Sequence, residues 1–496
     1  MLEIAKEDIV ARLAFDNPWW NAEPSAKIAF QGTPRRTYFD SFFKALLDHS
    51  VHRAIVLMGP RRVGKTVMVY HAIRGLIDQG TEPNHILYLS LETPVYTGLP
   101  LARLLGLFLE KFGHQRETPL TLFFDEIQYL RDWEVHLKSL VDSYPEYKFV
   151  VTGSAAAALR LKSTESGAGR FSDYVLPPLT FAEYLKFIER DHELVELIAV
   201  SDPSRLGGSK FRAKDIAALN DEFINYLNFG GYPEAVFSAT IRGDPGQYIK
   251  SDIIDKVLLR DLPSLYGISD IQELNRLFTT LAYNTGNEVS LEGLSQSSGV
   301  AKNTIKRYLE YLEAAFLIRR VERIDQNAKR FKRAMCFKVY LTNPSMRAAL
   351  FGQINADAEA MGPLTETAIY SQWQHSQATQ LFYARWNTGE VDIVYMDSVE
   401  QRPEWAVEVK WSDRPFKARG ELDNCVEFVA KNPRIKQPML ITTRTVAAEN
   451  VDYSGVKFAF APSSVYAYTL GSNILSRLKQ STGPVAADQQ TRLPRT

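Results

Sequence analysis

The chain has 496 residues with 58 basic and 58 acidic side chains, and this length predicts about three domains because a single core does not grow to this size. The charge balance excludes a global basic field, so any contact with nucleic acid must come from local patches. The two cysteines, Cys336 and Cys425, lack metal-ligand spacing, which argues against disulfides and a zinc site. No apolar run approaches membrane-spanning length and the first residues lack a signal-peptide core, so we expect a cytoplasmic protein without a membrane segment.

A glycine loop between a predicted strand and a predicted helix is the strongest signal. The apolar run 54–58 precedes a G-x-x-x-x-G-K-T motif at 59–66, and a helix is predicted to begin at Lys65. Backbone N–H groups and a helix N-terminus arranged in this way bind phosphates. We expect Lys65 to reach the β- and γ-phosphates of ATP and the Thr66 hydroxyl to ligate Mg²⁺. The predicted nucleotide-binding residues of this loop are Gly59, Pro60, Arg61, Arg62, Val63, Gly64, Lys65, Thr66 and Val67.

Two further strands complete the predicted nucleotide site. The run 120–124 ends in Asp125 and Glu126, of which Asp125 is expected to hold Mg²⁺ through water and Glu126 to polarise the attacking water. Adjacent strand residues point to opposite faces, so the backbone must turn here for both acids to act. The run 148–154 brings Thr152 or Ser154 to sense the γ-phosphate or orient the water. The alternative, a solvated acid pair in a turn, is less favoured because of the P-loop upstream.

Strand and helix patterns alternate from about 51 to 178, which predicts a parallel sheet covered by helices on both faces. The expected strands are 54–58, 86–91, 120–124 and 149–152, and the expected helices begin at 65, cover 101–112 and lie near 133–141. The pattern then turns helical over 179–262, with a polar break at 201–209, and predicts a helical lid. From about Gly471 we expect a disordered tail.

A helix-turn-helix pattern occupies residues 291–309. A short helix, a turn at Gly299 and a second amphipathic helix would bury an apolar face and direct polar side chains outward, as a recognition helix does on DNA: Lys302, Asn303, Lys306 and Arg307. The basic run 329–333 lies where the wing of a winged helix would follow, and its cations would add salt-sensitive affinity for phosphates. The alternative is a packing or oligomer contact, because fold does not fix function.

Two predicted strands near the C-terminus carry a second group of ionisable residues. Glu408 and Lys410 are two residues apart and share a face, where Asp392 of the preceding strand can meet them. If Asp392 and Glu408 hold Mg²⁺ while Lys410 orients or deprotonates water, the group can cleave phosphodiesters. Glu366, from a preceding helix, is an additional candidate acid. The alternative is a charged hairpin face in which Glu408 and Lys410 only pair with neighbours.

Together these motifs resemble a known family of ATPases, through the stretches 59–66, 123–128 with Trp133, 152–154, 169–170, 179–184 and 230–234. They are similar to the prokaryotic AAA-type ATPases, and more narrowly to the branch joined to a C-terminal domain of unknown function with a winged helix and a restriction-endonuclease-like fold. The resemblance implies a P-loop ATPase in which Arg170 is an arginine finger or sensor, or else a salt-bridged loop residue. Asp392, Glu408 and Lys410 match the PD-(D/E)XK nuclease motif, whose domains include many that bind DNA without cutting it.

We therefore expect an α/β protein with an AAA-type P-loop NTPase core, a helical lid, a winged helix and a restriction-endonuclease-like α/β domain. The expected segments are 1–50 (N-terminal), 51–178 (ATPase core), 179–262 (lid), 263–345 (winged helix), 346–470 (nuclease-like) and 471–496 (tail). The predicted function is a Mg²⁺-dependent ATPase that acts on DNA as a homo-oligomer, with nuclease activity left open. The alternatives are an ATP-driven DNA translocase or branch-migration factor with an inactive nuclease fold, and a protein-partnered switch in defence or toxin control.

Overall fold

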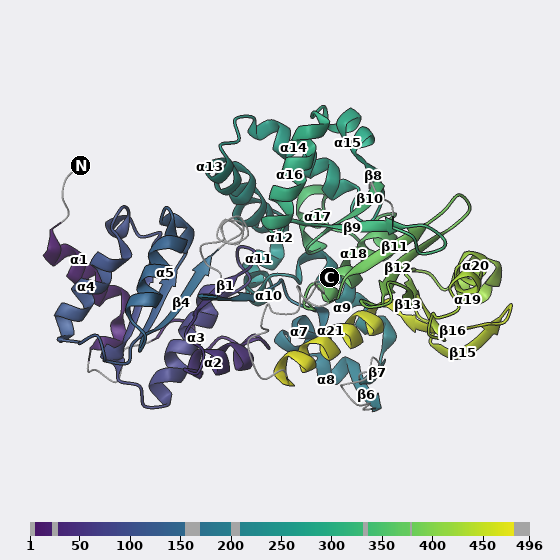
Figure 1. Cartoon of the computed structure of the whole chain (residues 1–496). Helices are drawn as coiled ribbons and strands as arrows, with labels where there is room; N and C mark the ends of the chain where they lie inside the picture. The colour runs from purple at the N-terminus through teal and green to yellow at the C-terminus, as the bar shows by residue number, and fades with distance from the viewer. Residues whose placement is uncertain are drawn as a thin grey trace, which may run out of the picture. The chain divides into compact units, whose positions relative to one another are not determined.

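The chain forms two units in a computed structural model (Figure 1), which describes residues 5–21, 28–153, 169–199, 209–330, 336–376 and 379–480. The first unit is built from described residues within Met1–Gly59, Gly64–Leu176 and Ser476–Thr496. The second unit is built from those within Pro60–Val63 and Pro177–Leu475. Each unit is described below by itself.

A parallel sheet forms the centre of the first unit. Its strands lie in the order β2-β3-β4-β1-β5: β1 (Ala54–Met58), β2 (Ile86–Ser90), β3 (Thr121–Asp125), β4 (Lys148–Gly153) and β5 (Phe171–Val175). The first four strands confirm the predicted ones, since each is an apolar run that the sheet buries. Strand β5 was not predicted, because its polar and half-exposed side chains do not form an apolar run.

Helices accompany the strands of the first unit, and three of them confirm predicted helices: α3 (Lys65–Asp78), α4 (Leu101–Phe112) and α5 (Trp133–Ser143). The N-terminal part adds α1 (Lys6–Asp16), the 3₁₀ turn η1 (Pro18–Trp20) and α2 (Phe39–Leu47), and further 3₁₀ turns are η2 (Pro83–His85), η3 (Pro94–Tyr96) and η4 (Ile127–Tyr129). Buried Asn17 donates to the carbonyl of Tyr88 at 2.8 Å. The N-terminal segment is thus fixed to strand β2.

The second unit begins with a mostly helical region, as predicted for 179–262. Thr180 and Glu183 form a capping box at the start of α7, which satisfies amides that the helix leaves free. The elements are α7 (Phe181–Phe187), α8 (Asp191–Leu194), α9 (Ile216–Phe229), α10 (Pro233–Phe237), α11 (Ala239–Gly243), α12 (Pro245–Ile249), the π-helical η6 (Lys250–Asp255) and η7 (Val257–Asp261), and α13 (Leu262–Tyr266). The antiparallel pair β6 (Val195–Ala199) and β7 (Lys210–Ala213) corrects the all-helical expectation. Residues 201–208 of the predicted polar break lie outside the described residues.

A second sheet, of nine strands, runs through the rest of this unit in the order β15-β16-β14-β13-β12-β11-β9-β10-β8. Its strands are β8 (Glu288–Ser290), β9 (Ile318–Ile324), β10 (Cys336–Leu341), β11 (Leu381–Arg385), β12 (Glu390–Met396), β13 (Pro403–Glu408), β14 (Met439–Thr443), β15 (Ala448–Tyr453) and β16 (Val456–Pro462). The parallel pairing of β9 with β11 joins the segments 263–345 and 346–470, which were predicted as separate domains.

Helices α14 (Ile271–Tyr283), α15 (Leu291–Ser298) and α16 (Lys302–Ala314) accompany strands β8, β9 and β10 in the chain. The predicted turn at Gly299 separates α15 from α16, and this glycine adopts a left-handed φ of 73°, which favours a residue without a Cβ. The remaining helical elements are α17 (Ser345–Phe351), α18 (Met361–Trp373), α19 (Arg414–Lys417), the 3₁₀ turn η8 (Arg419–Leu422), α20 (Asp423–Lys431) and α21 (Ser463–Gln480).

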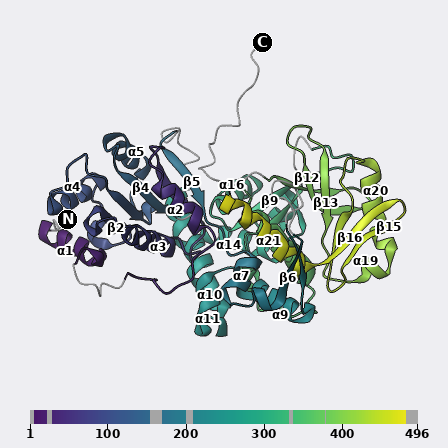
Figure 2. The ribbon, with the colours of Figure 1, turned by 90° about the horizontal axis from the view of Figure 1, so that it is seen from below.

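Helix α21 corrects the predicted disorder after Gly471 (Figure 2). Leu470 and Ile474 are buried, and their spacing of four residues places them on one helical face. The burial of this face orders a terminal segment that was predicted to be disordered. Residues 481–496, the rest of the predicted tail, lie outside the described residues.

Every described helix is too short or too polar to span a lipid bilayer.

The close approach of Gly231 to a buried asparagine gives a first testable prediction. A Cβ at Gly231 would lie 2.2 Å from Cγ of Asn343, whose side chain is held by a hydrogen bond from the amide of Ser345 at 2.9 Å. We expect Gly231→Ala to lower the free energy of unfolding by about 1–3 kcal/mol, as overpacking does. Urea unfolding measures this loss. Gly362→Ala is the matched control, because nothing lies within 4 Å of its added Cβ; an equal loss in both variants would contradict the steric explanation.

Candidate functional site

The loop between β1 and α3 has the backbone geometry of a phosphate-binding loop. Gly64, the residue before α3, adopts a φ of 96°, a conformation that glycine reaches without strain. Lys65 is buried, and its ammonium donates to the carbonyl of Gly59 at 3.0 Å. Thr66 and Val67 follow in the first turn of α3, where backbone N–H groups are left without partners inside the helix. The loop thus offers the donors that a phosphate requires.

Asp125 ends β3 at the carboxyl edge of the sheet and is held by hydroxyl groups. Its Oδ2 accepts from Thr66 Oγ1 at 2.9 Å and from the Tyr88 hydroxyl at 2.8 Å, and its Oδ1 accepts from Thr152 Oγ1. The carboxylate is only 3% exposed, so these hydrogen bonds compensate for the water that it has lost. Burial, with the nearby Asp125 carboxylate second, raises the pKa of Tyr88 far above its usual value, so this hydroxyl keeps its proton and donates.

Glu126 lies at a sharp turn of the backbone directly after β3. Its φ of 55° is left-handed, which confirms the turn that the adjacent acids required. The amide of Glu126 donates to Thr152 Oγ1 at 3.1 Å, and its side chain accepts from Gln128 Nε2. One hydroxyl, that of Thr152, therefore contacts both acidic residues. Ser154, predicted beside it, lies outside the described residues.

Tyr88 is a site residue that was not predicted. It lies on β2, where the backbone register pairs it with Phe123 and pairs Ser90 with Asp125. The diagonal distance to Asp125 is within reach of a long side chain. The sequence signal for this residue was a tyrosine within the apolar run of β2. A buried tyrosine hydroxyl usually has a hydrogen-bond partner, so a polar contact was to be expected there.

The arginines of the predicted loop have partners of their own in the second unit, to which Pro60–Val63 belongs. Arg61 Nε lies 2.8 Å from Asp261 Oδ2. Arg62 pairs with Glu234 at 3.1 Å and with Asp252 at 2.8 Å. In this structure their guanidinium groups are thus engaged with carboxylates.

Arg170 does not join the other predicted residues of the nucleotide site. Its carbonyl accepts from the amide of Ala54 at 2.9 Å, and its guanidinium pairs with Asp142. Ala54 is the first residue of β1, whereas the P-loop follows the last residue of β1. Arg170 therefore lies at the amino ends of the strands, opposite the P-loop. This is the salt-bridged position expected as the alternative, and a role as arginine finger in a neighbouring copy stays a prediction.

The residues at the carboxyl edge fit ATP with Mg²⁺. A threonine hydroxyl and a carboxylate lie 2.9 Å apart, and Mg²⁺ prefers oxygen ligands of this kind. The buried ammonium of Lys65 and the N-terminus of α3 supply positive charge and N–H donors from the adjoining loop.

The hydroxyl of Tyr88 can be tested separately from the loop. We expect Tyr88→Phe to lower the stability of the nucleotide-free protein by about 1.5–3 kcal/mol, since a hydrogen bond to a charged acceptor is removed. Differential scanning calorimetry measures this effect. Tyr144→Phe is the control at a half-exposed tyrosine stacked on Tyr147; equal losses in the two variants would contradict a special role for Tyr88.

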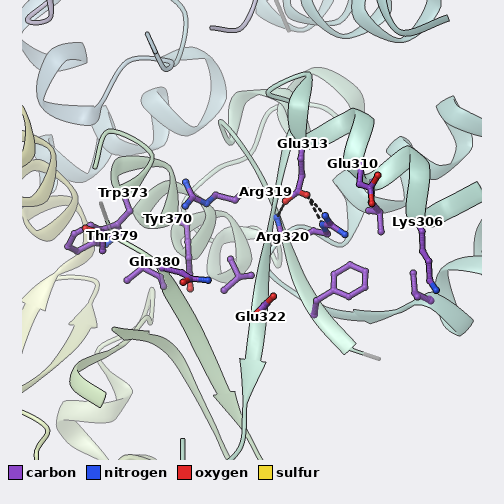
Figure 3. A pocket seen from close by; sticks show the side chains of 15 residues that line it. Lys306, Glu310, Glu313, Arg319, Arg320, Glu322, Tyr370, Trp373, Thr379 and Gln380 are labelled. Carbon is purple, nitrogen blue, oxygen red and sulfur yellow. Dashed lines mark hydrogen bonds and ion pairs between the residues drawn. The ribbon is translucent and has the colours of Figure 1, made fainter. Parts of the chain in front are cut away.

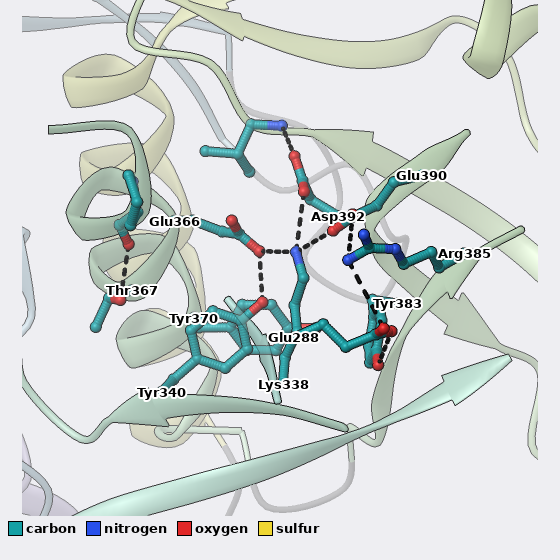
Figure 4. A network of polar contacts seen from close by, with 12 residues as sticks. Glu288, Lys338, Tyr340, Glu366, Thr367, Tyr370, Tyr383, Arg385, Glu390 and Asp392 are labelled. Atoms are coloured by element: carbon teal, nitrogen blue, oxygen red, sulfur yellow. Dashed lines mark hydrogen bonds and ion pairs between the residues drawn. The ribbon is translucent and has the colours of Figure 1, made fainter. Parts of the chain in front are cut away.

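A second group of charged side chains lies in the second unit (Figure 4). Figure 4 shows Asp392 of β12, which accepts from the amide of Val409 at 2.9 Å. Lys410 lies 2.7 Å from Glu408 and 3.8 Å from Asp392. Glu366 of α18 joins the group through Lys338, which lies 2.8 Å from Glu366 and 3.2 Å from Asp392. The structure thus brings together every residue predicted for this cluster.

Burial sets the protonation of these carboxyl groups. It raises the pKa of Glu366 to about 8, and the negative charge of Asp392 adds to this shift. It also raises the pKa of Glu408 to about 7. Burial opposes ionisation of Asp392 as well, but the ammonium groups of Lys338 and Lys410 outweigh it and lower the pKa of Asp392. Of these three acids, Asp392 is therefore the one that most readily stays ionised.

Lys338 was not predicted as part of this cluster, although a lysine inside the apolar run of β10 was a signal. Its ammonium lies 3.2 Å from Asp392, and Glu408 lies 2.7 Å from the predicted Lys410. Both predicted Mg²⁺ ligands therefore have a lysine ammonium group beside them. Within the described ranges, no group of three or more histidine, cysteine, aspartate or glutamate side chains has the geometry to hold a metal ion. The residues of this cluster do not fit a divalent metal.

A cavity of about 420 Å³ lies beside α16 and β9 (Figure 3). Its lining combines charged side chains, among them Lys306 and Arg319, with the aromatic rings of Tyr370 and Trp373. Arg320 at its wall pairs with Glu313. Lys306 belongs to α16, the predicted recognition helix, and was predicted to face DNA. The cavity therefore opens next to this helix.

Family comparisons agree with the geometry of the first unit. Residues 51–185 match the model of an AAA domain, and residues 220–357 match a domain of unknown function, DUF8612. With the P-loop and the sheet order, this defines an AAA-type P-loop ATPase domain in the chain.

Relatives of the chain occur in bacteria and archaea. An uncharacterized protein of Haemophilus influenzae is 24% identical over 310 residues, which are 61% of this chain and 70% of the relative. The uncharacterized protein MJ1637 of Methanocaldococcus jannaschii is 26% identical over 335 residues, which are 65% of this chain and 68% of the relative.

Among solved structures, the chain is similar to the Orc1 protein of Aeropyrum pernix in complex with DNA, with a TM-score of 0.30, 14% identity, and coverage of 67% of this chain and 95% of that one. It is also similar to the replication initiator DnaA bound to AMPPCP and single-stranded DNA, with a TM-score of 0.27, 14% identity, and coverage of 56% and 86%. TM-scores this low carry no functional conclusion.

Proposed function

We propose that the protein is a Mg²⁺-dependent ATPase. The observation that carries this proposal is the arrangement at the carboxyl edge of the first sheet, where Thr66 and Thr152 both donate to Asp125 and Glu126 turns away from β3. Such an edge is where parallel sheets place nucleotide chemistry. The match to the AAA domain supports the same assignment.

Each side chain then has a role in hydrolysis. Lys65 neutralises the charge that builds up on the transferred phosphoryl group. Thr66 with Asp125 would hold Mg²⁺, which would supply further positive charge to the phosphates. Glu126 orients the attacking water and accepts its proton. Thr152 keeps Asp125 and Glu126 in place, because its hydroxyl contacts both residues.

Two substitutions separate binding from hydrolysis. We expect Lys65→Ala to lower ATP turnover about 10²-fold or more, because a positioned positive charge is removed. Glu126→Gln should keep ATP bound while turnover falls by about 10²–10⁴-fold, since the general base is removed. Phosphate release and binding of a fluorescent ATP analogue measure the two effects.

The matched control for these variants is Arg74→Ala, at a partly exposed position of α3 where the guanidinium pairs with Asp78 one turn further along the helix. This change should leave turnover unaltered. Wild-type rates in both Lys65→Ala and Glu126→Gln would exclude the ATPase function.

We further propose that the second unit binds DNA through α16. Lys306 and Arg307 are exposed on this helix, while Ile305 and Leu309 of the same helix are buried. The order α14-β8-α15-α16-β9-β10, with β10 paired to both β8 and β9, supports a winged helix in which α16 is the recognition helix. Lys302 contributes less, because it pairs with Glu292. Of the predicted wing, Lys329 and Arg330 are exposed, and 331–333 lie outside the described residues.

Cleavage of DNA is not part of this proposal, since lysine ammonium groups occupy the acidic cluster. This favours a DNA-associated ATPase over a nuclease. Assembly into a homo-oligomer stays a prediction; the placement of Arg170 away from the P-loop of its own chain is compatible with a role in a neighbouring copy.

The DNA-binding proposal predicts a change in salt dependence. We expect the double variant Lys306→Gln with Arg307→Gln to weaken binding of duplex DNA independently of sequence. The slope of the logarithm of the binding constant against the logarithm of the salt concentration should fall by about 1 for each phosphate that the helix no longer neutralises. Fluorescence anisotropy at several salt concentrations measures both. Lys457→Gln, an exposed lysine on β16, is the control, and an unchanged slope in the α16 variant would return this helix to a structural role.

A further inference from the structure

The cavity beside α16 lies at a gap in the strand pairing of the second sheet. Strand β9 begins at Ile318, but its parallel pairing with β11 begins only at Glu322, which lies opposite Phe382. On its other side, β9 pairs with β10 along this whole stretch. Within the described chain, residues 318–321 therefore have no neighbouring strand on the β11 side, and three of these four residues line the cavity.

Fixed side chains give this cavity its shape. Glu313 Oε1 accepts from the backbone amide of Arg320 at 2.8 Å, and Glu313 Oε2 accepts from the Nε of the same arginine at 2.7 Å (Figure 3). The carboxylate thus satisfies an amide of β9 where no strand does. Trp373 of α18 stacks on Trp405, with ring centroids 5.2 Å apart. Because these groups are held by their neighbours, the cavity is formed before a ligand binds.

Four charged side chains of the lining are exposed and have no ion-pair or hydrogen-bond partner among the described residues: Lys306, Glu310, Arg319 and Glu322. The two cations attract an anion, whereas the two carboxylates repel an anion and accept N–H donors. Inorganic phosphate would satisfy only the cations, and an apolar molecule would satisfy none of the four. The lining therefore favours a ligand that carries both a negative charge and N–H donors.

A nucleotide unit has these two features and a flat ring as well. Its phosphate is negative, and the edges of adenine, guanine and cytosine carry amino donors. An unpaired base also stacks on aromatic side chains. The aromatic residues of the lining are Phe337, Tyr370 and Trp373, of which Trp373 is only partly buried. The volume of about 420 Å³ falls in the range of small-ligand sites, about 300–1,000 Å³.

The cavity adjoins the helix surface for which DNA binding is proposed. Lys306 lines the cavity and directly precedes Arg307, another exposed cation of α16. A strand whose phosphates contact these two side chains therefore passes the cavity. A paired base is held inside the duplex, so only a nucleotide outside the base stack can enter.

We propose that this cavity binds one unpaired nucleotide of a DNA strand that is held by α16. Arg319 pairs with the phosphate of this nucleotide, Trp373 contacts its base, and Glu310 and Glu322 accept from the amino groups of the base. The protein then prefers DNA in which a duplex opens into single strands over continuous duplex. This proposal rests on the proposed DNA binding by α16 and adds the DNA structure that is preferred.

The test compares a blunt duplex with the same duplex ending in a short unpaired fork, by fluorescence anisotropy with the full-length protein. We expect the wild type to bind the forked DNA about tenfold more tightly, the order expected for one stacked base. Arg319→Gln should bind both DNAs with the affinity of the wild type for the blunt duplex. Unchanged binding of the blunt duplex also shows that this variant is folded. Arg402→Gln, at an exposed arginine outside the cavity lining, should behave as the wild type.

Equal binding of the two DNAs by the wild type would overturn the cavity proposal alone, and so would a preference for the fork that Arg319→Gln retains. Failure to bind either DNA would overturn DNA binding by α16 as well. Isothermal titration with free dCMP distinguishes a nucleotide in a strand from a free one. Binding of dCMP that Arg319→Gln abolishes, without a preference for the fork, would assign the cavity to a free nucleotide and overturn the role of the strand.

Discussion

The need of a buried charge for polar or charged partners is the constraint on which both charged sites of this protein depend. Asp125 is buried at the end of β3 and is stabilised by hydroxyl donors from three other elements. Lys338 is buried in the second sheet and is stabilised by carboxylates from two elements. A buried charge without such partners is expensive, so each site fixes the elements that supply its partners.

The two sites satisfy this constraint with opposite consequences. The donors around Asp125 are neutral hydroxyls, so the carboxylate keeps a net negative charge. It also keeps a hydroxyl partner that can bind the same cation as the carboxylate. The acids around Lys338 face a permanent positive charge, which leaves little attraction for a metal. The same residue types that predict metal chemistry in a sequence can therefore produce a closed ionic network in the fold.

The pairing of β9 with β11 has a structural consequence for the second unit. It makes one sheet from a segment with the pattern of a winged helix and a segment with the pattern of a nuclease fold. Lys338 reinforces this junction, because it reaches from β10 to β12. A helix that contacts DNA in the first segment would thus be mechanically connected to the second.

Local patterns along the chain were enough to predict the nucleotide loop, the strands β1 to β4 and the acids at the end of β3. These features depend on glycine chemistry and on apolar runs that are buried wherever they occur. The spacing along a strand also predicted that Asp392, Glu408 and Lys410 could meet, since it fixes the face. Long-range packing was needed to establish that Tyr88 and Thr152 hold Asp125 and that Arg170 lies at the far end of its sheet. It was also needed to establish that α21 continues past Gly471 and that Lys338 fills the acidic cluster. Each of these depends on contacts between residues distant in the chain, and no local pattern specifies which distant side chain will neutralise a buried charge.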